Sequence, residues 1–182
     1  MNRRYFLSTF LLYIANLSIP SKVFAQSKDL PQVGSTAPQF KLPGYSKNPS
    51  NDKLWSLENF NNSWIVLYFY PKDFTKGCSI EAKGFQDKYR DFKRSGTEVI
   101  GISTDSEDKH ESFCNSENLD FLLLSDTEGL VSKQYGSWNQ PFSARNTFLI
   151  DPKGIIRERW IGVKPINHAN IVYKTLIELK KS

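Results

Sequence analysis

A strand, a helix and a second strand within residues 64–103 constrain the fold more than any other feature of the chain. Residues 64–70, WIVLYFY, are uniformly apolar or aromatic and predict a strand that is buried on both faces. Residues 97–103 predict the second strand. Between them, apolar side chains recur every three or four residues and predict one buried helix face: Cys78, Ala82, Phe85, Tyr89 and Phe92. Because strands joined in this way run parallel through a right-handed crossover, the unit predicts an α/β fold.

The rest of the chain extends this unit without a sign of a second domain. Further elements are expected as a helix at 106–118, a strand at 121–124, a short helix at 128–135, a β-hairpin of strands at 146–150 and 155–161, and a closing helix at 167–180. In the closing helix, Ile171, Leu176 and Leu179 are expected to face inward, and a short hairpin is expected around Gly44. This order predicts an α/β sandwich whose central mixed β-sheet is flanked by helices.

The first 25 residues differ from the domain that follows them. Two arginines at positions 3 and 4 precede an apolar stretch at 5–19, and Val23-Phe24-Ala25 fits a cleavage site. This pattern predicts a signal peptide at residues 1–25, of the twin-arginine or the general secretory type, and a mature domain at 26–182. An uncleaved anchor is the alternative, although a membrane span needs about 20 apolar residues. We therefore expect an exported protein, in a periplasm or a thylakoid lumen, without stable membrane insertion after cleavage.

Cleavage would also change the charge balance of the chain. The whole sequence carries 24 basic and 19 acidic residues, for a net charge of +5. Three of the basic residues, Arg3, Arg4 and Lys22, lie in the first 25 positions, so the mature domain keeps 21 basic residues against 19 acidic ones. No basic stripe follows the chain, and nucleic acid is therefore not expected as a partner.

The cysteines and histidines limit the possible chemistry. The two cysteines, Cys78 and Cys114, allow one disulfide in an exported protein. The absence of a Cys-x-x-Cys pair argues against a dithiol oxidoreductase or isomerase. The two histidines, His110 and His168, lie far apart in the sequence, so no metal site is expected.

Cys78 follows the first strand and stands at the start of the helix. Ligands of open α/β sheets collect at the carboxyl ends of strands, and a helix N-terminus offers unpaired N–H groups and a positive dipole end. A thiol in that position ionises more readily, and the thiolate is the nucleophilic form. The other interpretation is a small hydrophobic residue on the apolar helix face. Position alone leaves both interpretations open.

The residues around Cys78 resemble a known motif. Pro71-x-x-x-Thr75-x-x-Cys78 resembles the peroxidatic motif of the peroxiredoxins. The longer string at 68–82, YFYPKDFTKGCSIEA, resembles the Q-type or bacterioferritin comigratory protein subfamily of the AhpC/TSA superfamily. The likeness runs from Val33 to the C-terminal helix and includes GxxAPxF at 34–40, GISTD at 101–105, LSD at 124–126 and RNTFLIDPKG at 145–154. It implies a thioredoxin-like fold and a thiol-dependent peroxidase for hydrogen peroxide and organic hydroperoxides.

The resemblance also implies a role for each residue of the motif. Cys78 would attack the peroxide, while the Thr75 hydroxyl would hydrogen-bond its sulfur and the incoming substrate. Arg145 would stabilise the thiolate and polarise the O–O bond. Pro71 would shape the pocket, and the N–H groups of Gly77 and Cys78 would hold the second peroxide oxygen. These steps need no metal or organic cofactor. Taken singly, Thr75 also fits a helix cap and Arg145 a surface charge on a strand.

The sequence departs from the subfamily at two positions. Lys76 stands where proline is usual, and Lys83 stands where the resolving cysteine is familiar, five residues after Cys78. Cys114 resembles a second pattern of the subfamily, in which the next helix carries the resolving cysteine. This implies an intramolecular Cys78–Cys114 disulfide, reduced by a thioredoxin-like dithiol partner, in a protein expected to be a monomer. The alternatives are a one-cysteine peroxidase with a structural Cys114, and a non-enzymatic peroxide sensor on the same fold.

Overall fold

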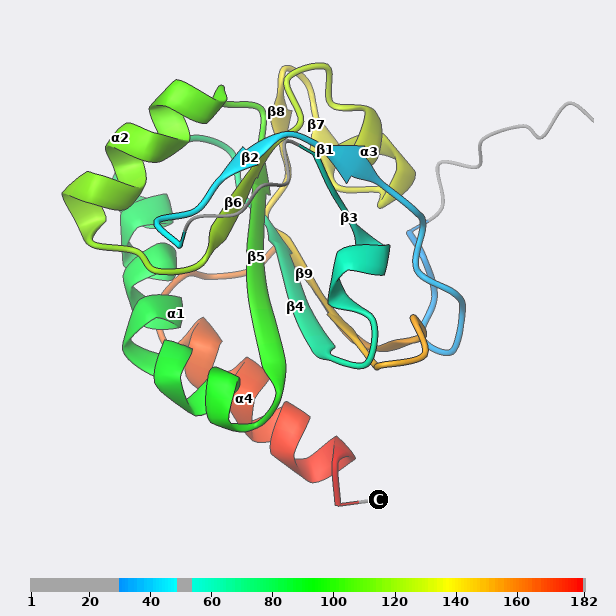
Figure 1. The fold of residues 1–182 in the computed structure, drawn as a ribbon. Helices are drawn as coiled ribbons and strands as arrows, with labels where there is room; N and C mark the ends of the chain where they lie inside the picture. Colours follow the sequence, from blue (N-terminus) through cyan, green and yellow to red (C-terminus); the bar gives the residue numbers. More distant parts are fainter. Residues whose placement is uncertain (1–29, 49–53, 182) are drawn as a thin grey trace, which may run out of the picture.

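The structure is a computed structural model, and it describes residues 30–48 and 54–181 (Figure 1). The predicted signal peptide at 1–25 and its cleavage site before Gln26 lie outside the described residues. In the part of the chain that is described, no helix has the length and apolarity needed to cross a membrane.

A six-stranded mixed sheet lies at the centre of the domain, in the strand order β10-β9-β4-β5-β6-β2. Three strands are parallel to one another: β4 (Trp64–Phe69), β5 (Thr97–Ser103) and β6 (Leu122–Ser125). Three further strands, each antiparallel to the strand it pairs with toward the centre, complete the sheet: β9 (Asn146–Ile150), β10 (Ile156–Ile161) and β2 (Gly44–Tyr45). The parallel unit and the C-terminal hairpin confirm the elements expected from the sequence. Two small two-stranded sheets join β1 (Lys41–Leu42) to β3 (Trp55–Ser56) and β7 (Trp138–Asn139) to β8 (Phe142–Ser143).

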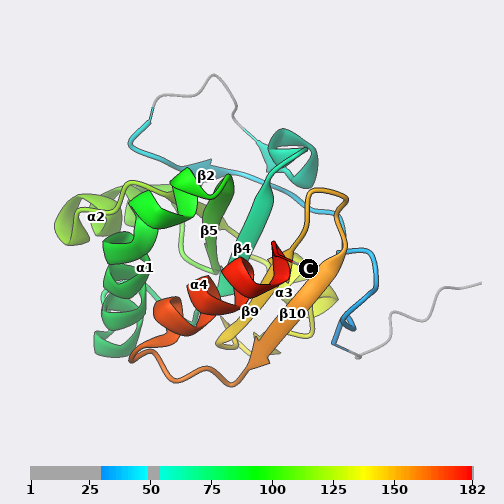
Figure 2. The ribbon, with the colours of Figure 1, turned by 90° about the horizontal axis from the view of Figure 1, so that it is seen from below.

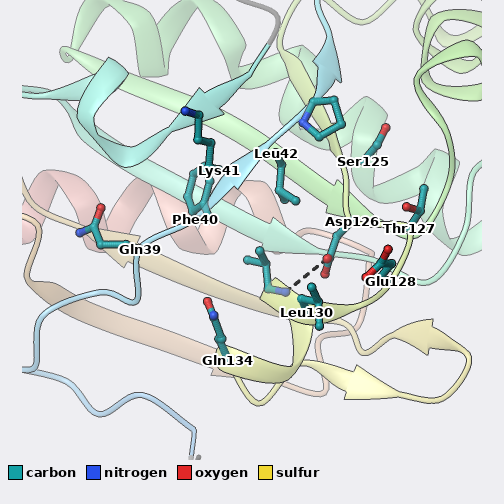
Figure 3. Close-up of a pocket in the computed structure, with 12 residues that line it drawn as sticks. Gln39, Phe40, Lys41, Leu42, Ser125, Asp126, Thr127, Glu128, Leu130 and Gln134 are labelled. Carbon is teal, nitrogen blue, oxygen red and sulfur yellow. Dashed lines mark hydrogen bonds between the residues drawn. The ribbon is translucent and has the colours of Figure 1, made fainter.

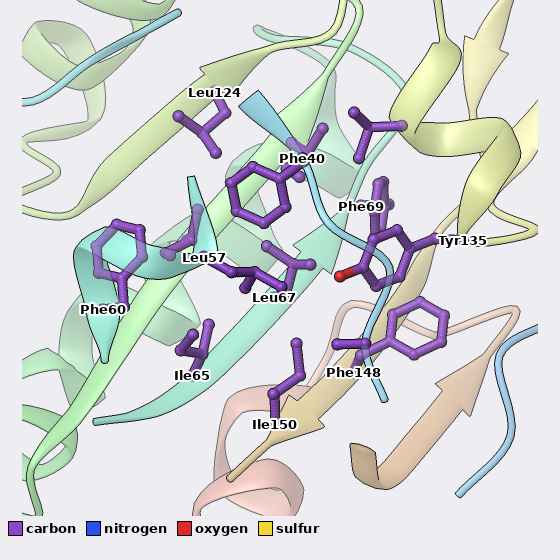
Figure 4. Close-up of a cluster of buried hydrophobic side chains, with 14 of the residues drawn as sticks. Phe40, Leu57, Phe60, Ile65, Leu67, Phe69, Leu124, Tyr135, Phe148 and Ile150 are labelled. Atoms are coloured by element: carbon purple, nitrogen blue, oxygen red, sulfur yellow. The ribbon is translucent and has the colours of Figure 1, made fainter. Parts of the chain in front are cut away.

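Helices cover the sheet unequally. One face carries α1 (Lys76–Arg94), α2 (Glu107–Glu117) and α4 (His168–Leu179), and Figure 2 shows α1 and α4 side by side on it. The other face carries the segment from Ala37 to Leu42, the 3₁₀ helix η1 (Leu57–Phe60) and the short helix α3 (Leu130–Gln134). Figure 4 shows how aromatic and aliphatic side chains fill this second layer. The sheet therefore lies between two apolar clusters.

Strand β4 explains why its sequence is uniformly apolar. Ile65, Leu67 and Phe69 enter the cluster beneath α3, whereas Val66 and Tyr68 enter the cluster beneath the three larger helices. Successive side chains of a strand point to opposite faces, so a strand covered on both sides requires an unbroken apolar run. The buried strand β4 thus leads directly into the loop that precedes Cys78.

Two details differ from the sequence-based expectations. No hairpin forms around Gly44, because β1 pairs with β3 while β2 pairs with β6. The backbone at Gly44 lies so close to β6 that a Cβ atom there would come within 2.5 Å of the Leu123 carbonyl oxygen. In α4, Ile171 is 46% exposed, and the inward face consists of His168, Ala169, Val172 and Leu176. Spacings of three and four fix that face, and Ile171 lies about 100° away from it, next to Val172.

Candidate active site

Cys78 lies in the first turn of α1, beyond the carboxyl end of β4, and is 1% exposed. Thr75 is the residue at which the helix begins, and the first backbone bond of this turn runs from the Ser79 N–H to the Thr75 carbonyl. The preceding N–H groups of the helix, including those of Gly77 and Cys78, have no partner within it. The thiol therefore lies beside free backbone donors at the positive end of a 19-residue helix.

Arg145, which directly precedes β9, brings a positive charge to the sulfur. Its Nη2 donates to the Cys78 Sγ at 3.3 Å, although the two residues are 67 positions apart. Close approach of the guanidinium also depends on Gly77, where a Cβ atom would come within 3.2 Å of Nη2. The contact expected between Arg145 and Cys78 is thus present in the fold. It places a fixed cation next to the group that must carry negative charge as a nucleophile.

A residue that the sequence analysis missed holds Arg145 in place. The Arg145 Nη1 forms an ion pair with the Glu81 Oε2, and Glu81 is 1% exposed. Burial raises the pKa of Glu81 to about 7, although Arg145 acts to lower it. Burial acts to lower the pKa of Arg145, but Glu81 and Cys78 together raise it, so the guanidinium stays charged. The sequence does contain a pattern that points to Glu81 as a site residue: it is three residues after Cys78, so both lie on one face of the helix.

Thr75 and Pro71 lie in the loop between β4 and α1. The Thr75 hydroxyl donates to the Lys72 carbonyl at 3.0 Å and closes the turn at 72–75. Among the described hydrogen bonds it makes none with the Cys78 sulfur, whose partner is Arg145. Pro71 follows Tyr70 and directly precedes this turn, and Phe74 within the turn has a left-handed backbone with φ of 60°. In this state Thr75 shapes the loop through its hydroxyl.

Cys114 lies in α2, and the structure leaves it unbonded to Cys78. Its side chain is fully buried, in the same apolar cluster as Cys78. Burial, helped by the nearby charge of Asp73, raises the pKa of the Cys114 thiol to about 12. In the folded form Cys114 is therefore a protonated, unreactive thiol.

The described residues contain no group of three or more His, Cys, Asp and Glu side chains that could hold a metal ion. His168 is buried, with its Nε2 2.9 Å from the Thr147 hydroxyl, and burial lowers its pKa to about 4. His110 belongs to a separate buried cluster with Tyr70 and Asp73, which the sequence analysis also missed.

A cavity of about 580 Å³ lies away from both thiols, between residues 39–43 and α3 (Figure 3). The carboxylate of Asp126 faces it but accepts hydrogen bonds from the N–H groups of Val131 and Ser132, at 3.2 and 2.7 Å. This acid therefore caps α3, so the surroundings of Cys78 remain the stronger candidate for an active site.

Comparisons with known proteins agree with this geometry. The sequence matches the AhpC/TSA family over residues 33–159. A putative peroxiredoxin bcp of Coxiella burnetii is 39% identical over 145 residues, which cover 75% of this chain and 93% of that protein. Peroxiredoxin Bcp of Bacillus subtilis is 34% identical, covering 82% of this chain and 98% of its own. Among solved structures, a cysteine-to-serine mutant of PrxQ from Xylella fastidiosa superposes with a TM-score of 0.75 at 31% identity, covering 84% of this chain and 99% of that one.

Proposed function

Because the chain belongs to the AhpC/TSA family and is a thiol-dependent peroxidase with a thioredoxin-like peroxiredoxin fold, we propose that Cys78 is the residue that reduces its hydroperoxide substrates. The observation that carries the proposal is the contact between the Arg145 guanidinium and the buried Cys78 sulfur. Hydrogen peroxide and organic hydroperoxides are the proposed substrates, since the reaction needs only the O–O bond that both share.

The proposed first step uses groups already in position. The Cys78 thiolate attacks one peroxide oxygen, the O–O bond breaks, and the leaving oxygen departs as water or an alcohol after taking up a proton. Cys78 becomes a sulfenic acid. Arg145 and the free N–H groups of the first turn stabilise the charge that develops on the oxygens, and Glu81 keeps Arg145 oriented. Pro71 and Thr75 shape the loop around the sulfur.

The proposed second step is resolution by Cys114. Its thiolate attacks the Cys78 sulfur, the S–S bond forms, and the hydroxyl of the sulfenic acid leaves as water. The burial of Cys114 and its raised pKa imply that α2 must open first. The same burial favours the second candidate, a one-cysteine peroxidase in which an external thiol resolves Cys78 and Cys114 is structural.

The proposed cycle ends with reduction of the disulfide by a thioredoxin-like dithiol. An intramolecular disulfide has no need of a second subunit, which supports a monomer. The pattern of residues 1–25 supports export to a periplasm or a thylakoid lumen, with a mature chain that begins at Gln26.

The test is peroxide consumption by residues 26–182 with a thioredoxin system, compared with that of Cys78→Ser and Cys114→Ser. A peroxide-driven disulfide that forms in the wild type and is lost in Cys114→Ser supports two cysteines. Turnover that persists in Cys114→Ser with thioredoxin alone supports the one-cysteine alternative. Equal peroxide consumption with and without Cys78 contradicts the proposal. Mass spectrometry of the native protein tests export, because residues 1–25 still attached would contradict cleavage.

A further inference from the structure

A buried polar cluster joins the loop before α1 to the helix that carries Cys114. The Asp73 Oδ2 lies 2.8 Å from the His110 Nδ1, and the Tyr70 hydroxyl donates to the Asp73 Oδ1 at 2.8 Å. The His110 Nε2 lies 3.2 Å from the Leu124 carbonyl oxygen of β6. The side chains of Asp73 and His110 are completely buried. None of these groups contacts the Cys78–Arg145 pair through a described hydrogen bond. The proposed reduction of peroxide at Cys78 therefore gives this cluster no role.

The hydrogen-bond partners of Asp73 and His110 determine where the protons between them must lie. A carbonyl oxygen only accepts, so the His110 Nε2 must carry a proton to bond Leu124. An ionised carboxylate also only accepts, so a second proton must lie between the Asp73 Oδ2 and the His110 Nδ1. The pair therefore shares one proton and forms a charge-assisted bond in a site without water access, where such bonds are strong.

The other contacts of α2 with the loop and with α1 are more exposed. The half-exposed ring of Phe74 lies edge-on to Phe113, with ring centres 5.2 Å apart. Near the far end of α2, Glu117 accepts from the Ser79 hydroxyl at 2.6 Å and pairs with the exposed Lys83. Beyond His110, the buried side chains of α2 are only Phe113 and Cys114. In the described part of the chain, the fully buried polar contacts between the loop and α2 are therefore the Asp73–His110 bond and the 3.5 Å approach of the Tyr70 hydroxyl to the same His110 Nδ1.

We propose that Asp73 and His110 are positioning residues that form a latch, which holds the helix of Cys114 closed on the Cys78 loop and whose opening sets the rate of disulfide formation. This inference rests on the proposed resolving role of Cys114. The opened latch lets the Cys114 thiolate attack the Cys78 sulfur, and the hydroxyl of the sulfenic acid leaves as water. Opening also separates Cys114 from the carboxylate of Asp73, which helps to keep its thiol protonated in the closed fold.

The test compares the two chemical steps in variants of His110, with rapid quenching, alkylation and mass spectrometry. His110→Leu removes the bonds to Asp73 and to the Leu124 carbonyl, and disulfide formation should become at least about tenfold faster, as expected when a bond to a charged group is lost from the closed state alone. His110→Asn can place an amide N–H close to the Nδ1 position and should restore a rate within about threefold of the wild type. Glu111→Gln, at an exposed neighbouring position on α2, is the matched control and should leave the rate unchanged.

The outcomes separate this inference from the proposal on which it rests. A wild type that consumes peroxide but forms no intramolecular disulfide removes the resolving role of Cys114, and the latch with it. A disulfide that forms at the same rate in His110→Leu and in the wild type overturns the latch alone.

A measurement on the wild type covers the case in which His110→Leu does not fold. With labelled histidine, NMR should detect a low-field Nδ1 proton for His110 in the reduced protein, and the signal should be lost in the Cys78–Cys114 disulfide form. A low-field signal that persists unchanged after disulfide formation overturns the latch.

Discussion

Helices α1 and α2 each follow a parallel strand of the sheet and each bury one cysteine, but they are attached to the fold in different ways. Helix α1 has 19 residues and buries three apolar side chains besides its thiol: Ala82, Phe85 and Phe92. It packs against both β5 and α4. Helix α2 has 11 residues, and one of its three buried side chains is the hydrogen-bonded His110.

This difference matches the two roles proposed for the thiols. The buried apolar side chains of α1 anchor the helix to the sheet and to α4. This anchoring keeps Cys78 in place beside Arg145. Helix α2 buries only Phe113 and Cys114 besides His110, so once the Asp73–His110 bond opens it can release Cys114 while the sheet remains folded. The thiol proposed to react with peroxide thus lies on the helix with more apolar burial, and the thiol proposed to resolve it lies on the helix with less.

The largest expected effect separates the two cysteines. Cys78→Ser should lower peroxide turnover to the uncatalysed background, because a hydroxyl in this position is far less nucleophilic than a thiolate. Cys114→Ser should leave the first oxidation step within about threefold of the wild type, since Cys114 takes no part in the proposed first step. Rapid-quench mass spectrometry of Cys78 measures that step. Turnover by Cys78→Ser above background would show that the reactive group lies elsewhere.

The next effect concerns the electrostatics on the side of α1. Arg145→Ala should slow oxidation of Cys78 by about 10²–10³-fold, the usual loss when one preorganised donor is removed. Arg145→Lys is the matched control. It keeps the charge but not the planar fork that reaches both Cys78 and Glu81, so we expect an intermediate rate. The bimolecular rate constant with hydrogen peroxide is the measurement, with a thermal unfolding curve to check the fold. A loss of less than about fivefold in Arg145→Ala would contradict the proposed role.

A third prediction tests the one charged group in the buried face of α1. Folding raises the pKa of Glu81 from 4.5 to about 7, so the folded state binds this proton more tightly than the unfolded state. The contribution of Glu81 to stability is therefore present below pH 4.5 and is lost as the pH rises to about 7. Relative to Glu81→Gln, the wild type should lose up to roughly 3 kcal/mol between pH 5 and 8.

Urea unfolding of both proteins at several pH values measures this difference. The test is the slope of the free energy of unfolding against pH. Glu81→Gln also removes the charged partner of Arg145, but this change shifts the stability of the variant equally at all of these pH values. Parallel curves for the two proteins would contradict the raised pKa.

The smallest effect should be confined to α2. Ser79→Ala removes the hydrogen bond to Glu117 and should favour opening of α2 by about 1 kcal/mol, or about fivefold in hydrogen exchange of residues 107–117. Exchange in β4 should not change. Ser112→Ala is the control, because its hydroxyl bonds only to the Asp108 carbonyl within α2. Faster exchange spread equally over β4 and α2 would mean that the two regions open as one unit.

The sequence alone determined the parts of this protein that local patterns encode. The apolar run before Pro71 specifies a strand buried on both faces, and spacings of three and four specify α1. The string from Tyr68 to Ala82 was sufficient to identify the family and to select Cys78 as the candidate nucleophile. Arg145 could be named only through the resemblance, because no local pattern links it to a residue 67 positions earlier.

Only the tertiary structure decided which polar groups meet. Glu81 and Arg145 are 64 positions apart and Asp73 and His110 are 37 apart, so strand order and helix placement bring each pair together. Periodicity reports which side of an element is buried, but it does not report what lies opposite. For the same reason, the sequence pattern did not reveal that β2 pairs with β6 or that Ile171 faces away from the sheet. Hydrogen bonds and ion pairs depend on distances of a few ångströms between distant segments, and only the packed fold sets those distances.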